Sequence, residues 1–379
     1  MKFTHALATL ALTTGLASAV PAPAAPPAPT TDVNPFVGYD FYVSPQYTDQ
    51  IESAIVNILK RGDVKLATQA AKVAQVSTFL WISDRASVSS ISTYLRDASL
   101  KPKKQIVQFV IYDLPDRDCS AKASDGEFHL SNGGEAKYKE YIDAVRKEFQ
   151  KYPNVKVAAL LEPDSIGNHV EKCANAAPAY KSLTAYAISK LGDLPNVSLY
   201  LDGAHAGWLG WPGNLAPTAD ILSGIYKAAQ ALNPKAKVRG VATNVSNYNG
   251  LGNQDQEARD ELKYHVALAP LLTAAGFPAH FIVDQGRSGN QVAIREGGDW
   301  CNFKNAGFGP RPTTKTPSPL VDAIVWVKPG GQSDGTSDTT SPRYDVACTS
   351  ATSQIPAPEA GGWFQAYFEL LIKQANPAF

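Results

Sequence analysis

Two carboxylates stand at the end of an apolar run near the middle of the chain. The run from Val157 to Leu161 is small or aliphatic, and Glu162 and Asp164 follow it with a proline between them. Such a run predicts a buried parallel strand, which the proline ends. In barrels and doubly wound α/β folds these strand ends face the substrate crevice, so Asp164 is a candidate for proton transfer. The alternative is a helix cap made by Asp164 or Ser165.

Polar side chains follow several other predicted strands in the same way. They are Asp84, Tyr112, Asp113, Asp116, Arg117, Asp118, Asp202, His205, Asn244, Asp284, Lys328 and Asp334. So many carboxylates at one edge of a sheet are costly unless they bind a ligand, catalyse a reaction or pair with cations. Their density favours a functional site at that edge.

Aromatic residues accompany these acids. Trp208 and Trp211 lie in a loop of glycines and a proline, and Trp300 precedes Cys301. Flat rings beside carboxylates, amides and lysine suit stacking on sugar rings while the polar groups bind hydroxyls. For each tryptophan taken singly, packing in the core is the alternative.

The elements that must position these residues alternate along the chain. Short β-branched or aromatic runs occur at 39–43, 78–82, 106–112, 155–161, 197–202, 238–244, 281–284 and 323–327. Helical patterns such as 51–61, 134–152, 179–191, 219–232 and 257–275 lie between them. This alternation predicts an α/β fold with a parallel sheet, open or closed, and right-handed crossovers.

Two long stretches, 113–134 and 329–362, follow carboxylate-bearing strands and are rich in Gly, Ser, Thr and Asp. We interpret them as loops that roof the site, because each contains a cysteine and a disulfide argues against disorder. Four cysteines allow three pairings. We favour Cys119 with Cys173 and Cys301 with Cys348, since each pair then closes a segment within its own half of the chain.

The first 19 residues have the pattern of a signal peptide, which ends at Ala17-Ser-Ala19. We therefore expect a secreted, extracellular protein, with a Pro/Ala-rich lead over 20–33 and a catalytic domain over 34–379. No other run is long and apolar enough to span a membrane. The charges balance at 35 basic and 35 acidic residues, which argues against nucleic acid and anionic membranes as partners.

Eight ordered motifs identify a family. They are Asn34-Pro-Phe36, Tyr112-Asp-Leu-Pro-Asp-Arg-Asp-Cys119, Leu161-Glu-Pro-Asp-Ser165, His205-Ala-Gly-Trp-Leu-Gly-Trp-Pro212, Thr243-Asn-Val-Ser-Asn-Tyr-Asn249, Asp284-Gln-Gly-Arg-Ser-Gly289, Gly298-Asp-Trp-Cys-Asn302 and Trp326-Val-Lys-Pro-Gly-Gly331. Together they resemble glycoside hydrolase family 6, and within it the secreted cellobiohydrolases. The resemblance runs from about Asn34 to Phe379, and no cellulose-binding module accompanies it.

The resemblance implies a distorted parallel (β/α) barrel of seven strands, one fewer than the eight runs above. It also implies inverting hydrolysis of β-1,4-glucosidic bonds in cellulose and cello-oligosaccharides, with cellobiose released from non-reducing ends and no cofactor or metal. By position Asp164 is the general acid, and Asp118 is the carboxylate that raises the pKa of that acid. Asp334 matches the residue proposed as base, and a water chain through Ser124 is the competing route. Tyr112 lies beneath the distorted sugar ring.

The same resemblance assigns the substrate contacts. Tyr42, Trp300, Lys328 and Gln332 would lie on the non-reducing side of the cleavage point. Arg117, Asp202, His205, Trp208, Trp211 and Asn244 would lie on the leaving-group side. Gln332 departs from the family, where glutamate is usual, so a negative charge is lost there.

Several alternatives stay open. Asp118 could instead pair with Arg117, and Asp334 could be a turn residue in Ser-Asp-Gly. An endoglucanase of the same family would have shorter loops, and an inactive carbohydrate-binding protein would lack Asp164 or Asp118. A metal-dependent hydrolase would need clustered ligands, yet the six histidines are scattered. We expect a monomer.

The chain carries two acceptor sequons for N-glycosylation, at Asn196 and Asn244. We expect Asn244 to be bare, because a glycan at the leaving-group subsites would block the tunnel. Asn196 is expected at the opposite end of the sheet, free to be modified.

Overall fold

The computed structural model describes residues 33–119, 121–171, 173–252, 259–291 and 299–379. Within it, Asn34–Phe379 forms one compact unit. The predicted signal peptide and nearly all of the Pro/Ala-rich lead lie outside the described residues. No helix of the described part is long and apolar enough to cross a membrane.

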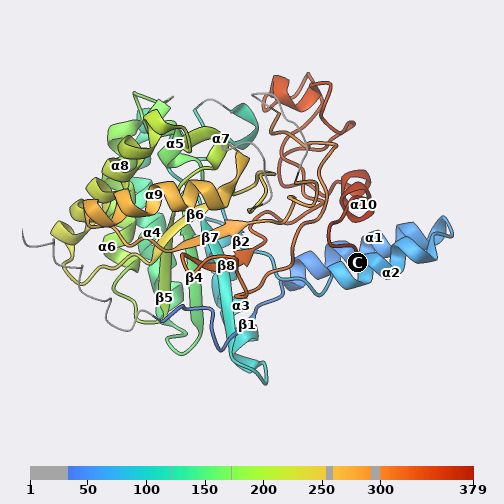
Figure 1. Cartoon of the computed structure of the whole chain (residues 1–379), viewed down its shortest axis with the longest axis horizontal. Coiled ribbons are helices and arrows are strands. Elements are labelled where there is room, and N and C mark those ends of the chain that lie inside the picture. The colour runs from blue at the N-terminus through green and yellow to red at the C-terminus, as the bar shows by residue number, and fades with distance from the viewer. Residues whose placement is uncertain (1–32, 120, 172, 253–258, 292–298) are drawn as a thin grey trace, which may run out of the picture. The chain divides into compact units, whose positions relative to one another are not determined.

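The centre of this unit is a parallel sheet of eight strand segments (Figure 1). They are β1 (Asp40–Phe41), β2 (Leu80–Ile82), β3 (Gln105–Ile111), β4 (Lys156–Leu161), β5 (Val197–Asp202), β6 (Gly240–Thr243), β7 (Phe281–Asp284) and β8 (Val321–Val325). β4 occupies one edge of β3, while β1 and β2 both pair with β3 and therefore share its other edge. Eight segments thus fill seven strand positions, which reconciles the eight apolar runs with the seven strands implied by the family resemblance.

Side chains alternate between the two faces of the sheet. Ile106, Val110, Ala158, Leu160, Tyr200, Ala242, Ile282, Ala323 and Val325 form a buried cluster on the inner face. Their neighbours Val107, Phe109, Val157, Ala159, Leu199, Val241 and Val283 join a second cluster beneath the helices. Because both faces are buried, the strands read as continuous apolar runs rather than as alternating ones.

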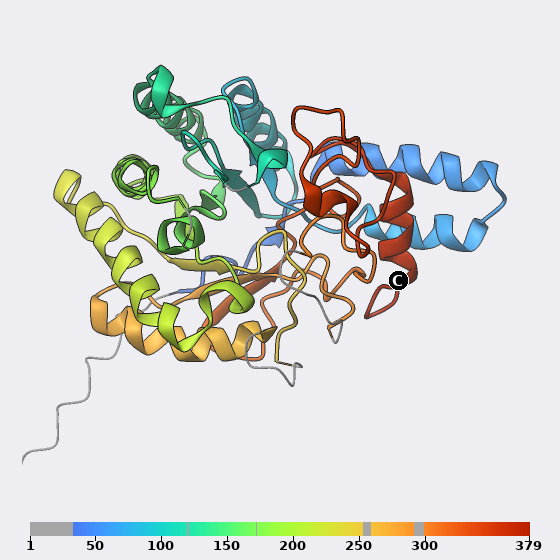
Figure 2. The ribbon, with the colours of Figure 1, turned by 90° about the horizontal axis from the view of Figure 1, so that it is seen from above.

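The helices that follow the strands cover the outer face. They are α3 (Ser90–Leu100), α4 (Gly134–Gln150), α6 (Ala177–Leu191), α8 (Pro212–Leu232) and α9 (Glu261–Ala275), with the short α5 (Ser165–Glu171) and α7 (Ala206–Leu209) after β4 and β5. Consecutive long helices contact one another from α3 to α9, in an arc that is visible in Figure 2. Asp260 caps α9 by accepting from the backbone nitrogens of Leu262 and Lys263.

A second hydrophobic core lies beside the sheet. It joins α1 (Pro45–Lys60), α2 (Val64–Val73) and α10 (Gln365–Lys373), and it includes Phe303, Phe308 and Trp326. The hydroxyl of Tyr47 in α1 donates to the carbonyl of Gly330, at 2.8 Å. This core therefore supports the base of the 329–362 loop. Four single-turn 3₁₀ helices complete the described elements: η1 (Ser87–Ser89), η2 (Lys122–Ser124), η3 (Leu130–Asn132) and η5 (Val346–Thr349).

Both predicted disulfides are present. Cys119 is bonded to Cys173, with 6.2 Å between the Cα atoms, and Cys301 is bonded to Cys348, with 4.9 Å. Each bond ties one of the two long loops to another part of the fold. The pairing inferred from the spacing of the cysteines is confirmed.

Candidate active site

The ends of β3, β4 and β5 bring the candidate acid together with its neighbours. The backbone nitrogen of Asp164 donates to Oδ2 of Asp202, at 2.9 Å. The hydroxyl of Tyr112 donates to Oδ2 of Asp118. Asp164 and Asp118 both have left-handed backbones, with φ of 64° and 51°. Non-glycine residues adopt this conformation rarely and at a cost, and such residues cluster at functional sites.

Asp118 is almost completely buried, at 7% exposure. Burial raises the pKa of this carboxyl, and hydrogen bonds from Ser124 and Tyr112 and the charge of Arg117 only partly offset the rise. Burial and the nearby carboxylates of Asp118 and Asp164 likewise raise the pKa of Tyr112. The structure thus groups Tyr112, Asp118, Ser124 and Asp164, as predicted from the sequence.

Arg117 has a structural place at this edge. Its guanidinium stacks over the ring of Tyr112, 4.1 Å from the ring centre, and donates to the carbonyl oxygen of Ser124, at 3.0 Å. Its ion pair is with Asp113, at 3.4 Å, and its side chain is 10% exposed. In this structure Arg117 therefore forms its ion pair with Asp113 and not with Asp118, the alternative considered from the sequence.

On the side of β5 and β6, the predicted residues differ in accessibility. Trp211 is 53% exposed, whereas Trp208 is half-buried with its ring against Gly167. His205 lies 3.3 Å from the side-chain amide of Asn249. Asn244 is fully buried, and its amide nitrogen donates to the carbonyl of Asp284 at 2.6 Å. A direct contact between Asn244 and a sugar does not fit this burial.

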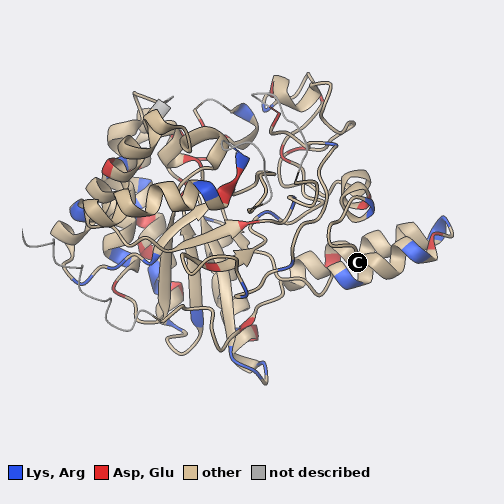
Figure 3. Cartoon of the chain, in the orientation of Figure 1, with Lys and Arg blue, Asp and Glu red and all other residues tan. Residues whose placement is uncertain are grey.

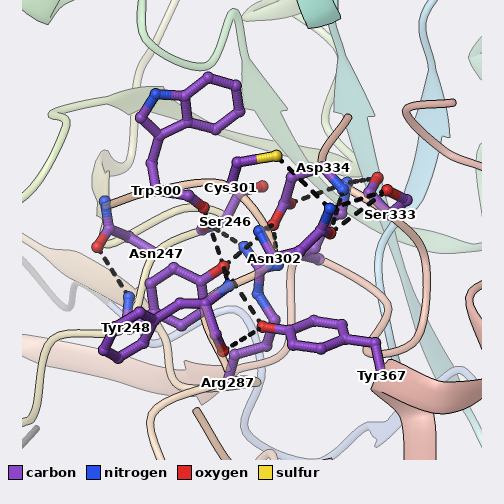
Figure 4. Close-up of polar contacts among 12 residues, drawn as sticks. Ser246, Asn247, Tyr248, Arg287, Trp300, Cys301, Asn302, Ser333, Asp334 and Tyr367 are labelled. Carbon is purple, nitrogen blue, oxygen red and sulfur yellow. Dashed lines mark hydrogen bonds and ion pairs between the residues drawn. The ribbon is translucent and has the colours of Figure 1, made fainter. Parts of the chain in front are cut away.

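Asp334, in the loop after β8, lies in a dense polar network (Figure 4). Its Oδ2 accepts from Arg287 Nη1 at 2.6 Å, from the Tyr248 hydroxyl at 3.0 Å and from the Asn302 nitrogen at 2.8 Å. Its Oδ1 lies 3.5 Å from Lys328 Nζ. Burial alone would raise the pKa of Asp334, but the charges of Arg287 and Lys328 outweigh burial and lower it. Asp334 is therefore a buried ion-pair residue and not a solvated turn.

The remaining residues predicted on the non-reducing side differ in position. Tyr42 is fully buried in the cluster beneath the helices, and its hydroxyl donates to Asp97 at 2.8 Å. The sugar contact predicted for Tyr42 is therefore wrong in this structure, because its side chain faces the outer side of the sheet. Trp300 is half-buried, and its carbonyl accepts from Tyr248. Gln332 donates to Gln50 of α1, at 3.1 Å.

The sequence profile described as "Glycosyl hydrolases family 6" matches residues 36–375. This chain belongs to glycoside hydrolase family 6. It is 51% identical over 357 residues to Exoglucanase 3 of Agaricus bisporus, which covers 91% of this chain and 80% of that protein. It is 48% identical over 369 residues to 1,4-beta-D-glucan cellobiohydrolase C of Emericella nidulans, with 92% and 80% covered.

The solved structure of cellobiohydrolase II from Humicola insolens, in complex with glucose and cellotetraose, is also similar. Its TM-score is 0.85 at 43% identity, and the match covers 92% of this chain and 100% of that one. The family resemblance read from the eight motifs is thereby confirmed, and so is the class of enzyme.

Several residues of this family 6 site were missed by the sequence analysis. Arg287 lies inside the quoted motif 284–289, yet nothing local indicates that it pairs with Asp334. The partners Tyr248 and Asn302 come from two further segments. Glu261, fully buried at the start of α9, accepts from the nitrogen of Ala206 at 2.9 Å and from Asn249 at 2.7 Å. Only their contacts in the fold link these groups to the predicted site residues.

The two long loops of the family 6 fold meet. Arg343 of the 329–362 loop donates from Nη2 to the carbonyl oxygen of Ala123 in the 113–134 loop, at 2.5 Å. Among the described residues, no group of three or more His, Cys, Asp or Glu side chains could hold a metal ion.

Proposed function

We propose that this family 6 hydrolase cleaves β-1,4-glucosidic bonds in cellulose and cello-oligosaccharides with inversion, and that it releases cellobiose from non-reducing ends. The names of its relatives, including two cellobiohydrolases, and the cellotetraose bound by one of them support the reaction and the substrate. An inverting hydrolase needs one carboxylic acid for the leaving oxygen and a basic route that activates water on the other face.

The observation that carries the proposal is the group of Asp164, Tyr112 and Asp118. Asp164 is the general acid, held at the end of β4. Asp118 accepts a hydrogen bond from the hydroxyl of Tyr112. The carboxylates of Asp118 and Asp164 both raise the pKa of Tyr112, so both lie near its ring. A second carboxylate in a buried site favours the protonated form of the acid and also stabilises the positive charge that develops on the sugar.

The attacking water needs a proton acceptor, and the ion pairs of Asp334 argue against that residue. A carboxylate whose pKa is lowered by two cations accepts a proton weakly. Ser124, in contrast, lies beside Asp118, whose pKa is raised by burial. These contacts support a water route through Ser124 and Asp118, with Asp334 as the counter-ion of Arg287 and Lys328.

We assign sugar binding to the exposed and half-buried groups around these acids. On the leaving-group side they are Trp211, Trp208 and His205, and on the non-reducing side they are Trp300, Lys328 and Gln332. Basic and acidic residues are interspersed along the ribbon (Figure 3), which suits a neutral polysaccharide as substrate. We also propose that the protein is secreted as a monomer after removal of residues 1–19, and the two disulfides support an oxidising compartment.

Release from chain ends follows from the loops. The contact between Arg343 and Ala123 supports a roofed tunnel, which a chain must enter by its end.

Two measurements test the function. Proton NMR during hydrolysis of a soluble cello-oligosaccharide should show the α-anomer of the product first. Carboxymethylcellulose should lose viscosity slowly relative to the reducing ends formed. First formation of the β-anomer would refute inversion, and a steep early loss of viscosity would favour an endoglucanase.

A further inference from the structure

A guanidinium group joins the two long loops. Arg343 is separated from its acceptor, the carbonyl of Ala123, by 220 positions in the sequence. Ala123 is fully buried in the middle of η2, the short helix of the opposite loop. Nε of Arg343 is buried and makes no hydrogen bond within the described residues. The Nη2 contact therefore pins η2 from the side of the 329–362 loop.

The same two loops also approach each other closely at Gly335 and Ala123. A Cβ atom added to Gly335 would lie 2.8 Å from Cβ of Ala123 and 2.6 Å from Sγ of Cys348. Cβ atoms in proteins do not come so close, and Cys348 cannot move freely because it is bonded to Cys301. Only glycine at this position permits the observed approach to η2.

Ser124 is the last residue of η2, and a second arginine, Arg117, binds its backbone carbonyl. Arg117 donates from Nε to the carbonyl of Ser124, at 3.0 Å. The hydroxyl of Ser124 donates to the carbonyl of Ala121, at 3.5 Å, and lies near enough to Asp118 to lower the pKa of that carboxyl. Two guanidinium groups, one from each long loop, thus hold the adjacent carbonyls of Ala123 and Ser124. The position of the Ser124 hydroxyl depends on both.

We propose that Arg343 is a positioning residue, which couples closure of the 329–362 loop to the placement of Ser124 beside Asp118. This inference rests on the proposed function, in which Ser124 and Asp118 carry the proton of the attacking water. When the loop is open, Arg343 is withdrawn from Ala123 and η2 is held by Arg117 alone. The water route is then complete only while both loops enclose the sugar chain, so a chain in an open cleft is cleaved slowly.

The test uses the full secreted enzyme with Arg343→Ala, Arg343→Lys and a matched control, Arg311→Ala. Arg311 also donates to backbone carbonyls, those of Pro377 and Ala378, at the C-terminus. In Arg343→Ala, kcat on a soluble cello-oligosaccharide should fall about 10–100-fold with little change in KM. Hydrogen exchange of the amides in 121–125 should become faster. Arg343→Lys should recover part of both effects, since an ammonium group can still donate to one carbonyl.

Gly335→Ala is a second route to the same disruption, because it separates the loops without changing either arginine. It should speed exchange in 121–125 as Arg343→Ala does. A wild-type kcat for Arg343→Ala, or a loss of kcat without faster exchange, would overturn the proposal. So would an equal loss in Arg311→Ala. If the wild type released no cellobiose, the proposed function would fail, while the exchange comparison would still report whether Arg343 couples the loops.

Discussion

The backbone nitrogen of Asp164 donates a hydrogen bond of 2.9 Å to the carboxylate of Asp202. The same oxygen, Oδ2, accepts from the nitrogen of Ala204 at 3.0 Å, and Oδ1 is buried without a hydrogen bond in the described residues. Asp202 therefore ties the end of β4 to the end of β5. We expect the left-handed backbone of the proposed acid to depend on this hydrogen bond.

Asp202→Ala should consequently misplace the acid. We expect kcat on a cello-oligosaccharide to fall about 10–100-fold, because a displacement of about 1 Å can cost that much. Asp202→Asn is the matched variant, since its amide oxygen can replace Oδ2 and its NH₂ can take the place of Oδ1. Steady-state kinetics of both variants, with their melting temperatures, make the check. Wild-type turnover in Asp202→Ala would show that the tie does not position the acid.

The acid itself is tested by varying the leaving group. Asp164→Ala should lose about 10²–10⁴-fold in kcat on unactivated oligosaccharides, the usual contribution of general acid catalysis. It should retain far more activity on a dinitrophenyl cellobioside, whose leaving group departs without a proton. Substrate affinity, measured by calorimetry, should be preserved. An equal loss on both substrates would argue that Asp164 does not donate the proton.

Asp334 gives a contrasting prediction. Removing it leaves Arg287 and Lys328 buried without their counter-ion, so Asp334→Ala should cost about 3–5 kcal/mol of unfolding free energy. Azide, which can replace a missing general base as nucleophile, should not restore turnover in this variant. Urea unfolding and assays with azide provide the measurements. Formation of a glycosyl azide with recovery of the rate would return the role of base to Asp334.

Much of the fold follows from local sequence signals, and the differences have physical causes. All eight strands were predicted, because burial on both faces gives unbroken apolar runs. The sugar contact of Tyr42 was assigned by the family resemblance, and only the fold shows that this side chain, just beyond the two-residue strand β1, packs beneath the helices. The hydrogen-bond partners of Asp334 come from segments 32 to 86 positions away. No local pattern encodes contacts of that range.

A buried glutamate predicts how stability depends on pH. Burial raises the pKa of Glu261 to about 7. Between its unfolded pKa, about 4.3, and pH 7 the folded state binds more protons than the unfolded state, so stability falls as the pH rises through this window. Glu162 and Asp202, also raised to about 7, act in the same direction. The wild type should therefore be more stable at pH 5 than at pH 8.

Glu261→Gln should reduce that difference by on the order of 1 kcal/mol or more. The variant keeps the oxygen that accepts from Ala206 and Asn249, and its NH₂ replaces Oε2, which has no hydrogen-bond partner in the described part of the chain. Urea denaturation at several pH values measures the effect. An unchanged dependence on pH would show that Glu261 ionises normally in the folded enzyme.

Both glycosylation sequons should be empty in the folded enzyme. Asn196 is 6% exposed, and its amide nitrogen donates to the carbonyls of Tyr152 and Val155, at 3.2 and 3.1 Å. The expectation that Asn196 is free to be modified is therefore wrong, since the nitrogen that would carry the glycan is buried at the start of β5. Asn244 is fully buried, which gives a stronger reason for its being bare than a blocked tunnel. Mass spectrometry of peptides from the secreted protein should find both residues unmodified. A glycan on Asn196 in active enzyme would mean that the turn before β5 is more open than the structure has it.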